Sequence, residues 1–197
     1  MRSVFFAAAL GCLAACTCLP AAAAEPMDIH SILYDAQASV GSHALTLNGA
    51  GLRKKLFFKV YAAGLYVPQT SNDSSALMAQ PGAARVRLGL LRDVSGASFI
   101  SALDDGLKAN LSESTARDIA AELEALRTLM RNIGDVKKGD LVDFDFVPEK
   151  GTVVLLNGNP VGAPIGGGRT LYNAVLAIWL GPKAIDETLK AGMLGGK

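Results

Sequence analysis

The sequence predicts an α+β fold in which an antiparallel sheet is covered by a layer of helices. Strand-like segments occur in two blocks, with helical segments between and after them, so the βαβ alternation of a parallel sheet is absent. Turns rich in glycine, proline and asparagine join the later strands into a meander, which is typical of antiparallel pairing. The 197 residues, 50% of them apolar, contain no long linker, and we expect a single domain.

The first 24 residues have the pattern of a signal peptide. Arg2 supplies the charged start, an apolar stretch runs from Val4 to Leu19, Pro20 breaks it, and three alanines end at Ala24. A second interpretation stays open, because Leu13-Ala14-Ala15-Cys16 matches the pattern at which bacterial lipoproteins are cut, which would place a lipid anchor on Cys16. Both interpretations put the domain outside the cytoplasm, as a periplasmic, secreted or membrane-anchored protein.

The composition of the remaining chain excludes several kinds of chemistry. Cys12, Cys16 and Cys18 all lie in the leader, so a protein cut after Ala24 has no thiol for a disulfide, a zinc site or a nucleophile. The same cut leaves 18 basic and 18 acidic residues, which gives no global attraction to nucleic acid or to an anionic membrane. His30 and His43 have no neighbours at metal-ligand spacing, so we expect neither a metal nor another cofactor.

The first half of the domain predicts strands and then two helices. We expect residues 25–43 to form an N-terminal extension and residues 44–197 to form the domain. Residues 44–67 predict a strand, a glycine bend at Asn48-Gly49-Ala50-Gly51 and a second strand over 56–67. Residues 84–91 predict another strand, with Arg85 and Arg87 on one face. Apolar residues recurring at every third or fourth position predict helices over 95–110 and 119–133, and Gly134 ends the second.

The second half predicts a meander followed by two helices. Residues 141–147 alternate, and we expect Asp143 and Asp145 on the solvated face of this strand, with a cation site or an acid–base pair as the alternative. Turns at 148–151 and at Asn157-Gly158 lead into strands over 152–156 and 160–165. An apolar core helix over 171–180 ends at Gly181-Pro182, and a short helix covers 185–193. The glycines at 166–168 before Arg169 predict either a hinge or an anion site.

Basic and aromatic residues alternate around Arg53 and Tyr61. The neutral charge of the mature chain argues against nucleic acid as a partner of this segment. Arg53 and Tyr61 are eight residues apart, so an unbroken strand would separate them by about 26 Å. A turn or bulge, placed near Lys54-Lys55, would be needed to bring them together.

Several segments resemble the chalcone isomerase-like family. The most specific block is Asn48-Gly49-Ala50-Gly51-Leu52-Arg53 followed by Val60-Tyr61-Ala62-Ala63-Gly64. Arg92-Asp93-Val94-Ser95, Leu107-Lys108-Ala109-Asn110, Leu156-Asn157-Gly158 and Ile178-Trp179-Leu180-Gly181 are similar to its exported bacterial branch. The resemblance implies an open-faced β-sandwich with a ligand cleft between the sheet and its helices.

The resemblance also implies site residues. One branch of the family cyclises chalcones to flavanones, and another binds fatty acids through an arginine and a tyrosine, to which Arg53 and Tyr61 correspond. The catalytic tyrosine of the isomerase corresponds to Phe99, and its asparagine partner lies near Gly106. Neither of these positions keeps the polar group, and Phe99 can neither donate nor accept a hydrogen bond. Residues expected to line the cleft are Phe99, Leu103, Gly106 and Thr170.

Three hypotheses about function remain at this stage. The preferred one is a non-catalytic binder of a fatty acid or another small apolar carboxylate, with Arg53 clamping the anion and Tyr61 donating a hydrogen bond. The second is an isomerase, an intramolecular lyase acting on an enone, in which Arg53 is the electrophilic group. The third is an interaction module of the cell envelope whose cleft is closed by Phe57, Phe58 and Trp179.

Overall fold

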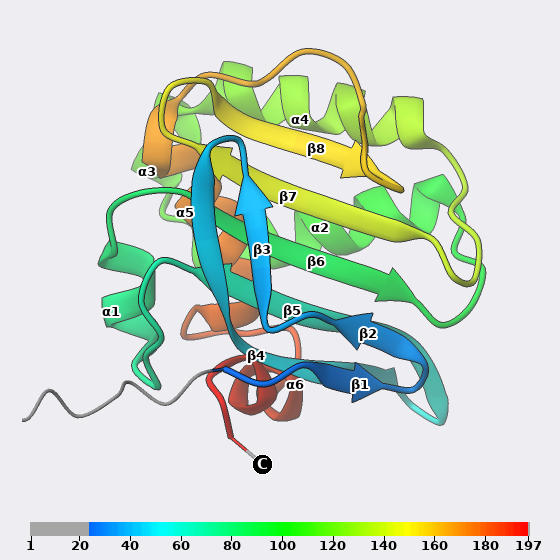
Figure 1. Cartoon of the computed structure of the whole chain (residues 1–197). Coiled ribbons are helices and arrows are strands. Elements are labelled where there is room, and N and C mark those ends of the chain that lie inside the picture. Colours follow the sequence, from blue (N-terminus) through cyan, green and yellow to red (C-terminus); the bar gives the residue numbers. More distant parts are fainter. Residues whose placement is uncertain (1–23, 197) are drawn as a thin grey trace, which may run out of the picture.

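A seven-stranded antiparallel sheet forms the centre of the structure, a computed structural model that describes residues 24–196 (Figure 1). The strands lie in the order β3-β4-β5-β6-β7-β8-β9, so each pairs with its neighbour in sequence. Their bounds are β3 Gln37–Val40, β4 His43–Lys55, β5 Phe58–Val67, β6 Ala84–Leu90, β7 Leu141–Val147, β8 Gly151–Leu156 and β9 Asn159–Pro160. The predicted leader, apart from Ala24, lies outside the described residues.

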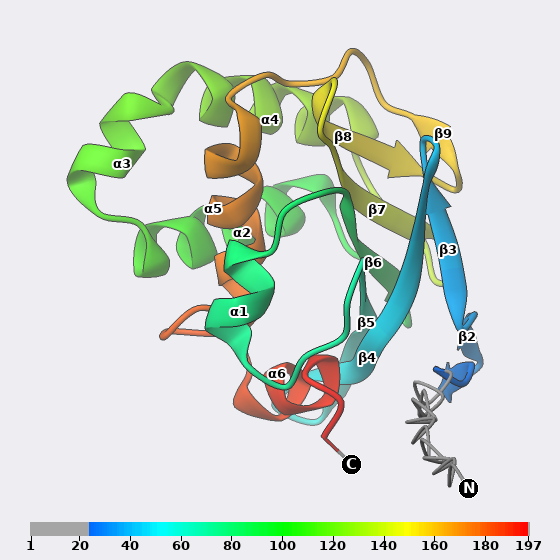
Figure 2. The same ribbon diagram turned by 60° about the vertical axis from the view of Figure 1, so that its left-hand side comes forward.

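Helices cover one face of this sheet (Figure 2). They are α1 Ser74–Ala79, α2 Gly96–Asn110, α3 Glu113–Asp118, α4 Ala120–Ile133, α5 Gly168–Leu180 and α6 Glu187–Met193. Helix α5 packs between α2 and the sheet, and its residues from 171 to 180 are buried except Asn173. The α+β class and the layer of helices predicted from the sequence are confirmed, as are the ends of α2 and α4.

The N-terminal segment covers the opposite face of the sheet. Strands β1 (Met27–Ile29) and β2 (Ile32–Tyr34) form a separate hairpin, and β3 joins the main sheet beside β4. A Cβ atom on Gly64 would lie 2.4 Å from the Tyr34 ring, so the absence of a side chain lets Tyr34 lie flat on the sheet. Residues 25–43, expected as an extension, therefore contribute three strands and an apolar cluster to the fold.

This cover corrects the expectation for Asp143 and Asp145. Both carboxylates lie on the face opposite the main core, as the alternation predicts, but they are buried, at 1% and 4% exposure. Arg87 binds Asp143 through Nε and Nη2, both at 2.8 Å, and Arg85 binds Asp145 at 2.7 and 2.6 Å. The β3–β4 hairpin curls over β7 and excludes water from a face that would otherwise be solvated (Figure 1).

The predicted glycine bend does not separate two strands, although the register of β4 shifts between Leu47 and Gly49. Gly49 and Gly51 lie inside β4, and the chain reverses at Leu56-Phe57. A Cβ atom on Gly49 would lie 2.3 Å from the carbonyl oxygen of Gly192, and one on Gly51 would lie 2.8 Å from that of Leu189. The glycines therefore let α6 lie directly on the strand.

The end of the meander is shorter than predicted. Strand β9 has two residues, and Ile165 forms only an isolated bridge with Thr152. Pro160 lacks an N–H to donate, and Gly162 has a φ of 81°, so a regular strand cannot continue to residue 165. The short helices α1 and α3 were not predicted, although Asp73 and Ser112 cap their first turns with side-chain oxygens.

Candidate functional site

A cavity of about 740 Å³ opens on the helix side of the sheet, between strands β4 to β6 and helix α2. This volume lies within the range of about 300–1,000 Å³ that small-molecule sites occupy. From the sheet and the β4–β5 turn, the lining residues are Arg53, Lys55, Leu56, Phe58, Val60, Tyr61 and Leu90. Helix α2 and the segment before it add Arg92, Asp93, Val94, Ser95, Ser98, Phe99, Ala102, Asp105, Gly106 and Ala109. The segment between α5 and α6 adds Lys183 and Ile185.

A second cavity of about 40 Å³ shares Tyr61, Phe99, Ala102 and Ile185 with the first. Its other lining residues are the apolar core side chains Leu88, Leu103, Phe144, Ile178 and Trp179. The shared residues thus separate a larger space with charged groups from a smaller apolar space next to the core.

Arg53 lines the larger cavity and is largely buried, with 18% of its side chain exposed. Its Nη1 atom donates to the backbone oxygen of Lys54 and, at 3.1 Å, to Oδ2 of Asp186. Among the described residues, Nε and Nη2 of Arg53 make no hydrogen bond. Two groups of donors on the guanidinium are therefore available to an incoming acceptor.

Asp186 holds Arg53 in place from the start of α6. Its Oδ1 atom accepts from the N–H groups of Thr188 and Leu189 as the N-cap, and its Oδ2 accepts from Arg53 and from the N–H of Lys54. Burial alone would raise the pKa of this carboxyl, but the hydrogen bonds from Leu189, Lys54 and Arg53 outweigh it and lower the pKa below 3.8. Because the pKa of Asp186 is lower in the folded than in the unfolded state, its ionisation stabilises the fold at any pH above the unfolded-state pKa. This contribution is lost as the pH falls through the folded-state pKa.

Tyr61 lies directly opposite Arg53 in the β4–β5 pair, so both side chains share one face. The register shifts between Arg53 and Lys54, which leaves Val60 as the extra residue of a β-bulge. The turn at Leu56-Phe57 and this bulge bring Arg53 and Tyr61 together. The sequence correctly required a turn, but placed it two residues too early.

The Tyr61 hydroxyl remains a hydrogen-bond donor at neutral pH. It accepts a hydrogen bond of 3.1 Å from Nε1 of Trp179 on α5. Burial raises the pKa of Tyr61 to about 12, although Trp179 and Arg53 lower it in part. Because the Tyr61 oxygen accepts from Trp179, its O–H group is free to donate a hydrogen bond to a group in the cavity.

We expect the native protein to resist tyrosine ionisation at pH 10. Burial raises the pKa of all four tyrosines, to about 12 for Tyr61 and Tyr66 and further for Tyr34 and Tyr172. At pH 10 the absorbance at 295 nm should show only a few per cent tyrosinate, against about half in the urea-unfolded chain. Because the folded state holds these protons more tightly, its stability should fall as the pH rises above 10. Native ionisation equal to that of the unfolded chain would contradict this burial.

The other residues predicted for the cleft divide into two groups. Phe99 and Gly106 line the larger cavity, and Leu103 lines the smaller one. Thr170 is exposed near the start of α5 and lines neither cavity. Phe57, expected to help close the cleft, is 98% exposed and points away from the interior.

Sequence reasoning missed the partners that position Arg53 and Tyr61. Asp186 stands where the predicted last helix begins, and an aspartate followed by Glu-Thr is a recognisable N-cap. Its position beside Arg53 could not be read, because 133 residues separate the two in sequence. Arg92 and Lys183 at the cavity were missed for the same reason.

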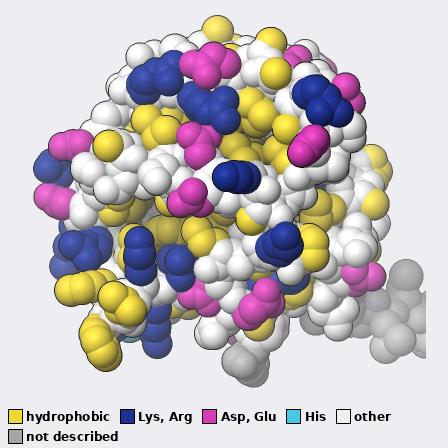
Figure 3. Space-filling view, turned by 180° about the vertical axis from the view of Figure 1, so that it is seen from behind, with side chains coloured by type: hydrophobic (Ala, Val, Ile, Leu, Met, Phe, Trp, Pro, Cys, Tyr) yellow, Lys and Arg dark blue, Asp and Glu magenta, His cyan; other side chains and the backbone are white. Residues whose placement is uncertain are grey.

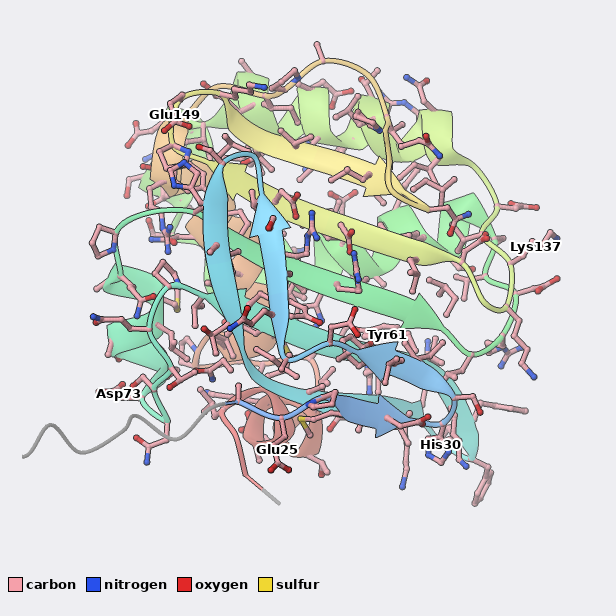
Figure 4. The ribbon with its side chains drawn as sticks, viewed as in Figure 1. Glu25, His30, Tyr61, Asp73, Lys137 and Glu149 are labelled. Carbon is pink, nitrogen blue, oxygen red and sulfur yellow. The ribbon has the colours of Figure 1, made fainter. Side chains whose placement is uncertain are left out.

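The remaining candidates have structural partners. His43 pairs with Glu149 at 3.2 Å, and His30 lies beside Lys59. The two histidines are far from each other, since Figure 4 shows His30 and Glu149 at opposite ends of the molecule. Arg169 donates to the carbonyl of Gly82 at 2.6 Å, so its guanidinium holds a loop. Within residues 24–196, no group of three His, Cys, Asp or Glu side chains is arranged to hold a metal, and no helix is long and apolar enough to cross a bilayer.

An open antiparallel sheet with a cavity beneath its helices is the arrangement expected of chalcone isomerase-like proteins. The sequence matches the chalcone isomerase-like family over residues 26–195, and the chain belongs to that family. The resemblance inferred from the sequence is therefore confirmed.

A solved structure shares this fold. The chain is similar to the crystal structure of a fatty-acid binding protein from Arabidopsis thaliana, with a TM-score of 0.65 and 19% sequence identity. The match covers 86% of this chain and 96% of that one. At this identity the likeness concerns the fold. Among curated proteins, no sequence matches the chain.

Proposed function

We propose that this protein is a non-catalytic binder of an apolar carboxylate such as a fatty acid. The observation that carries the proposal is the cavity of about 740 Å³ with the largely buried guanidinium of Arg53 in its wall. Tyr61 lies on the same face, and its hydroxyl accepts from Trp179, so its own O–H group is free to donate to the ligand. The fold shared with a fatty-acid binding protein supports the same class of ligand.

The charges around the cavity favour an anionic head group. Arg53, Lys55, Arg92 and Lys183 line it, against the two acids Asp93 and Asp105. Asp93 is already engaged by Lys137 at 3.3 Å and by the N–H of Lys138. The apolar side chains from β5, β6 and α2 provide a surface for the hydrocarbon chain.

Replacing Arg53 with methionine should weaken binding of hexadecanoic acid by about 10- to 100-fold. A hydrogen bond to a charged group contributes about 1.5–3 kcal/mol, and 1.4 kcal/mol corresponds to a factor of ten. Calorimetric titration measures the affinity, and hexadecanol, which has no carboxylate, should bind both proteins alike. Arg117→Met is a matched control, because that arginine is exposed on α3.

Asp186→Asn gives an independent check of the same site. Asparagine keeps the N-cap hydrogen bonds to Thr188 and Leu189 but removes the negative charge that competes for Arg53. Affinity for the carboxylate should then rise severalfold. Equal affinities in wild type, Arg53→Met and Asp186→Asn would contradict the proposed clamp, and cyclisation of a chalcone that Arg53→Met abolishes would contradict a non-catalytic role.

We also infer that the protein is exported, because residues 1–24 have the pattern of a signal peptide. The lipoprotein pattern ending at Cys16 leaves a lipid anchor as the alternative form of export. Intact mass spectrometry of the protein from its own host distinguishes a chain that starts at Glu25 from one that starts at an acylated Cys16. A full-length chain starting at Met1 would contradict both.

A further inference from the structure

The tip of the β4–β5 hairpin is exposed, apolar and basic. We call residues 54–59 the hairpin tip; their sequence is Lys-Lys-Leu-Phe-Phe-Lys, and all six are exposed. Leu56, Phe57 and Phe58 are 84%, 98% and 57% exposed, which is unusual for neighbouring large apolar side chains. Figure 3 shows apolar side chains protruding at the lower left, with basic side chains around them.

The turn residues of this hairpin are not those that the turn geometry favours. Leu56 has a φ of 55°, a conformation in which a leucine is strained. The β8–β9 hairpin of the same sheet has Asn157-Gly158 at its turn, with φ values of 52° and 81°, and these residues adopt such angles readily. Leucine and phenylalanine at the tip therefore do not serve the turn, and an apolar partner would account for them.

The charge of the hairpin tip restricts that partner. The tip contains Lys54, Lys55 and Lys59 and no acid, whereas the whole chain has a net charge of only +1. Arg92 adds a fourth cation, since its guanidinium lies 4.8 Å above the Phe58 ring. A second copy of the same tip would be repelled. An apolar tip surrounded by cations instead fits an anionic lipid bilayer, where lysines meet headgroups and rings enter the acyl boundary.

We propose that the hairpin tip docks on the surface of an anionic phospholipid bilayer, with Leu56, Phe57 and Phe58 inserted between the headgroups. Leu56 and Phe58 also line the large cavity, so docking would place the mouth of the cavity at the lipid surface. Phe57 does not line the cavity. The proposal therefore stands apart from the proposed binding of a carboxylate and can fail without it.

Insertion can be measured with a reporter at the tip. The chain has one tryptophan, Trp179, which is only 3% exposed and out of reach of lipid. In Phe57→Trp, vesicles of phosphatidylglycerol and brominated phosphatidylcholine should quench the new indole and shift its emission to the blue. The wild-type emission should stay unchanged, and it serves as the internal control. Absence of quenching in Phe57→Trp would overturn the proposal.

Sedimentation with phosphatidylglycerol-containing vesicles tests the two kinds of side chain separately. Phe57→Ser should weaken binding about tenfold, and Lys54→Gln or Lys59→Gln about fivefold each. Lys150→Gln at the exposed β7–β8 turn is the matched control and should bind as wild type does. All variants share the full chain, so residues 1–23 cannot cause a difference between them.

The alternatives give different results. If wild type and Phe57→Ser bind vesicles equally, the tip does not insert and the proposal is wrong. The proposal is also wrong if wild type does not bind vesicles but forms a dimer, seen by light scattering, that Phe57→Ser lacks. The same holds if wild type binds an oligonucleotide instead of vesicles and Phe57→Ser does not. Hexadecanoic acid should bind Phe57→Ser and wild type equally, so a failure of docking is distinguished from a failure of ligand binding.

Discussion

Replacing Asp143 with alanine should cost about 3–5 kcal/mol of unfolding free energy. The Asp143 side chain is 2% exposed and accepts two hydrogen bonds of 2.8 Å from Arg87. Arg87 would remain charged in the variant, because a guanidinium does not lose its proton in a protein even when its partner is removed. Without Asp143 the structure would hold this charge without its bidentate partner. Urea unfolding followed by circular dichroism measures the loss.

A double variant separates the cost of an unpaired charge from the value of the pair. In Arg87→Met combined with Asp143→Leu, both charges disappear and apolar atoms replace them, so the loss should be clearly smaller than in Asp143→Ala alone. Asp118→Ala, at an exposed position on α3, is the matched control and should change stability by less than about 0.5 kcal/mol. An Asp143→Ala protein as stable as this control would show that the pair is solvated.

Local patterns in the sequence predicted most of the elements, because each depends on nearby residues. Apolar spacing located α2, α4 and α5, and the alternation over 141–147 assigned Asp143 and Asp145 to the correct face of β7. Whether that face meets water depends on the β3–β4 hairpin, which lies about 100 residues away in sequence. Alternation reports the two faces of a strand but carries no information about what covers them.

In the candidate site, too, the sequence predicted what depends on nearby residues and missed what depends on contacts between distant segments. The sequence singled out Arg53 and Tyr61, and the structure makes them cross-strand neighbours. The turn between them was misplaced because Leu56-Phe57 carries none of the usual turn residues, whereas Asn157-Gly158 was found at once. The contact of Arg53 with Asp186 depends on how α6 packs against β4, which no local pattern encodes.

The packing of α6 against β4 leads to the second large effect, at Gly49. Gly49, Gly51 and Arg53 follow one another at alternate positions of β4, so they share a face. Along α6 they meet Gly192, Leu189 and the N-cap Asp186 in turn. The two glycines thus keep the helix close enough for Asp186 to reach Arg53.

Gly49→Ala should therefore destabilise the fold by about 3 kcal/mol, at the upper end of what overpacking usually costs. The added Cβ would lie 2.3 Å from the carbonyl oxygen of Gly192 and 2.7 Å from the N of Gly195, and backbone atoms cannot rotate away as a side chain can. The matched control is Gly166→Ala, because a Cβ at Gly166 meets nothing within 4 Å.

The two glycine variants also test how the site is assembled. In urea unfolding, Gly166→Ala should stay within about 0.5 kcal/mol of wild type. Gly49→Ala should in addition weaken binding of hexadecanoic acid, since a displaced α6 would also shift Lys183 and Ile185, which line the cavity in the segment before that helix. If Gly49→Ala and Gly166→Ala were equally stable, the close approach of α6 to β4 would not be what these glycines provide.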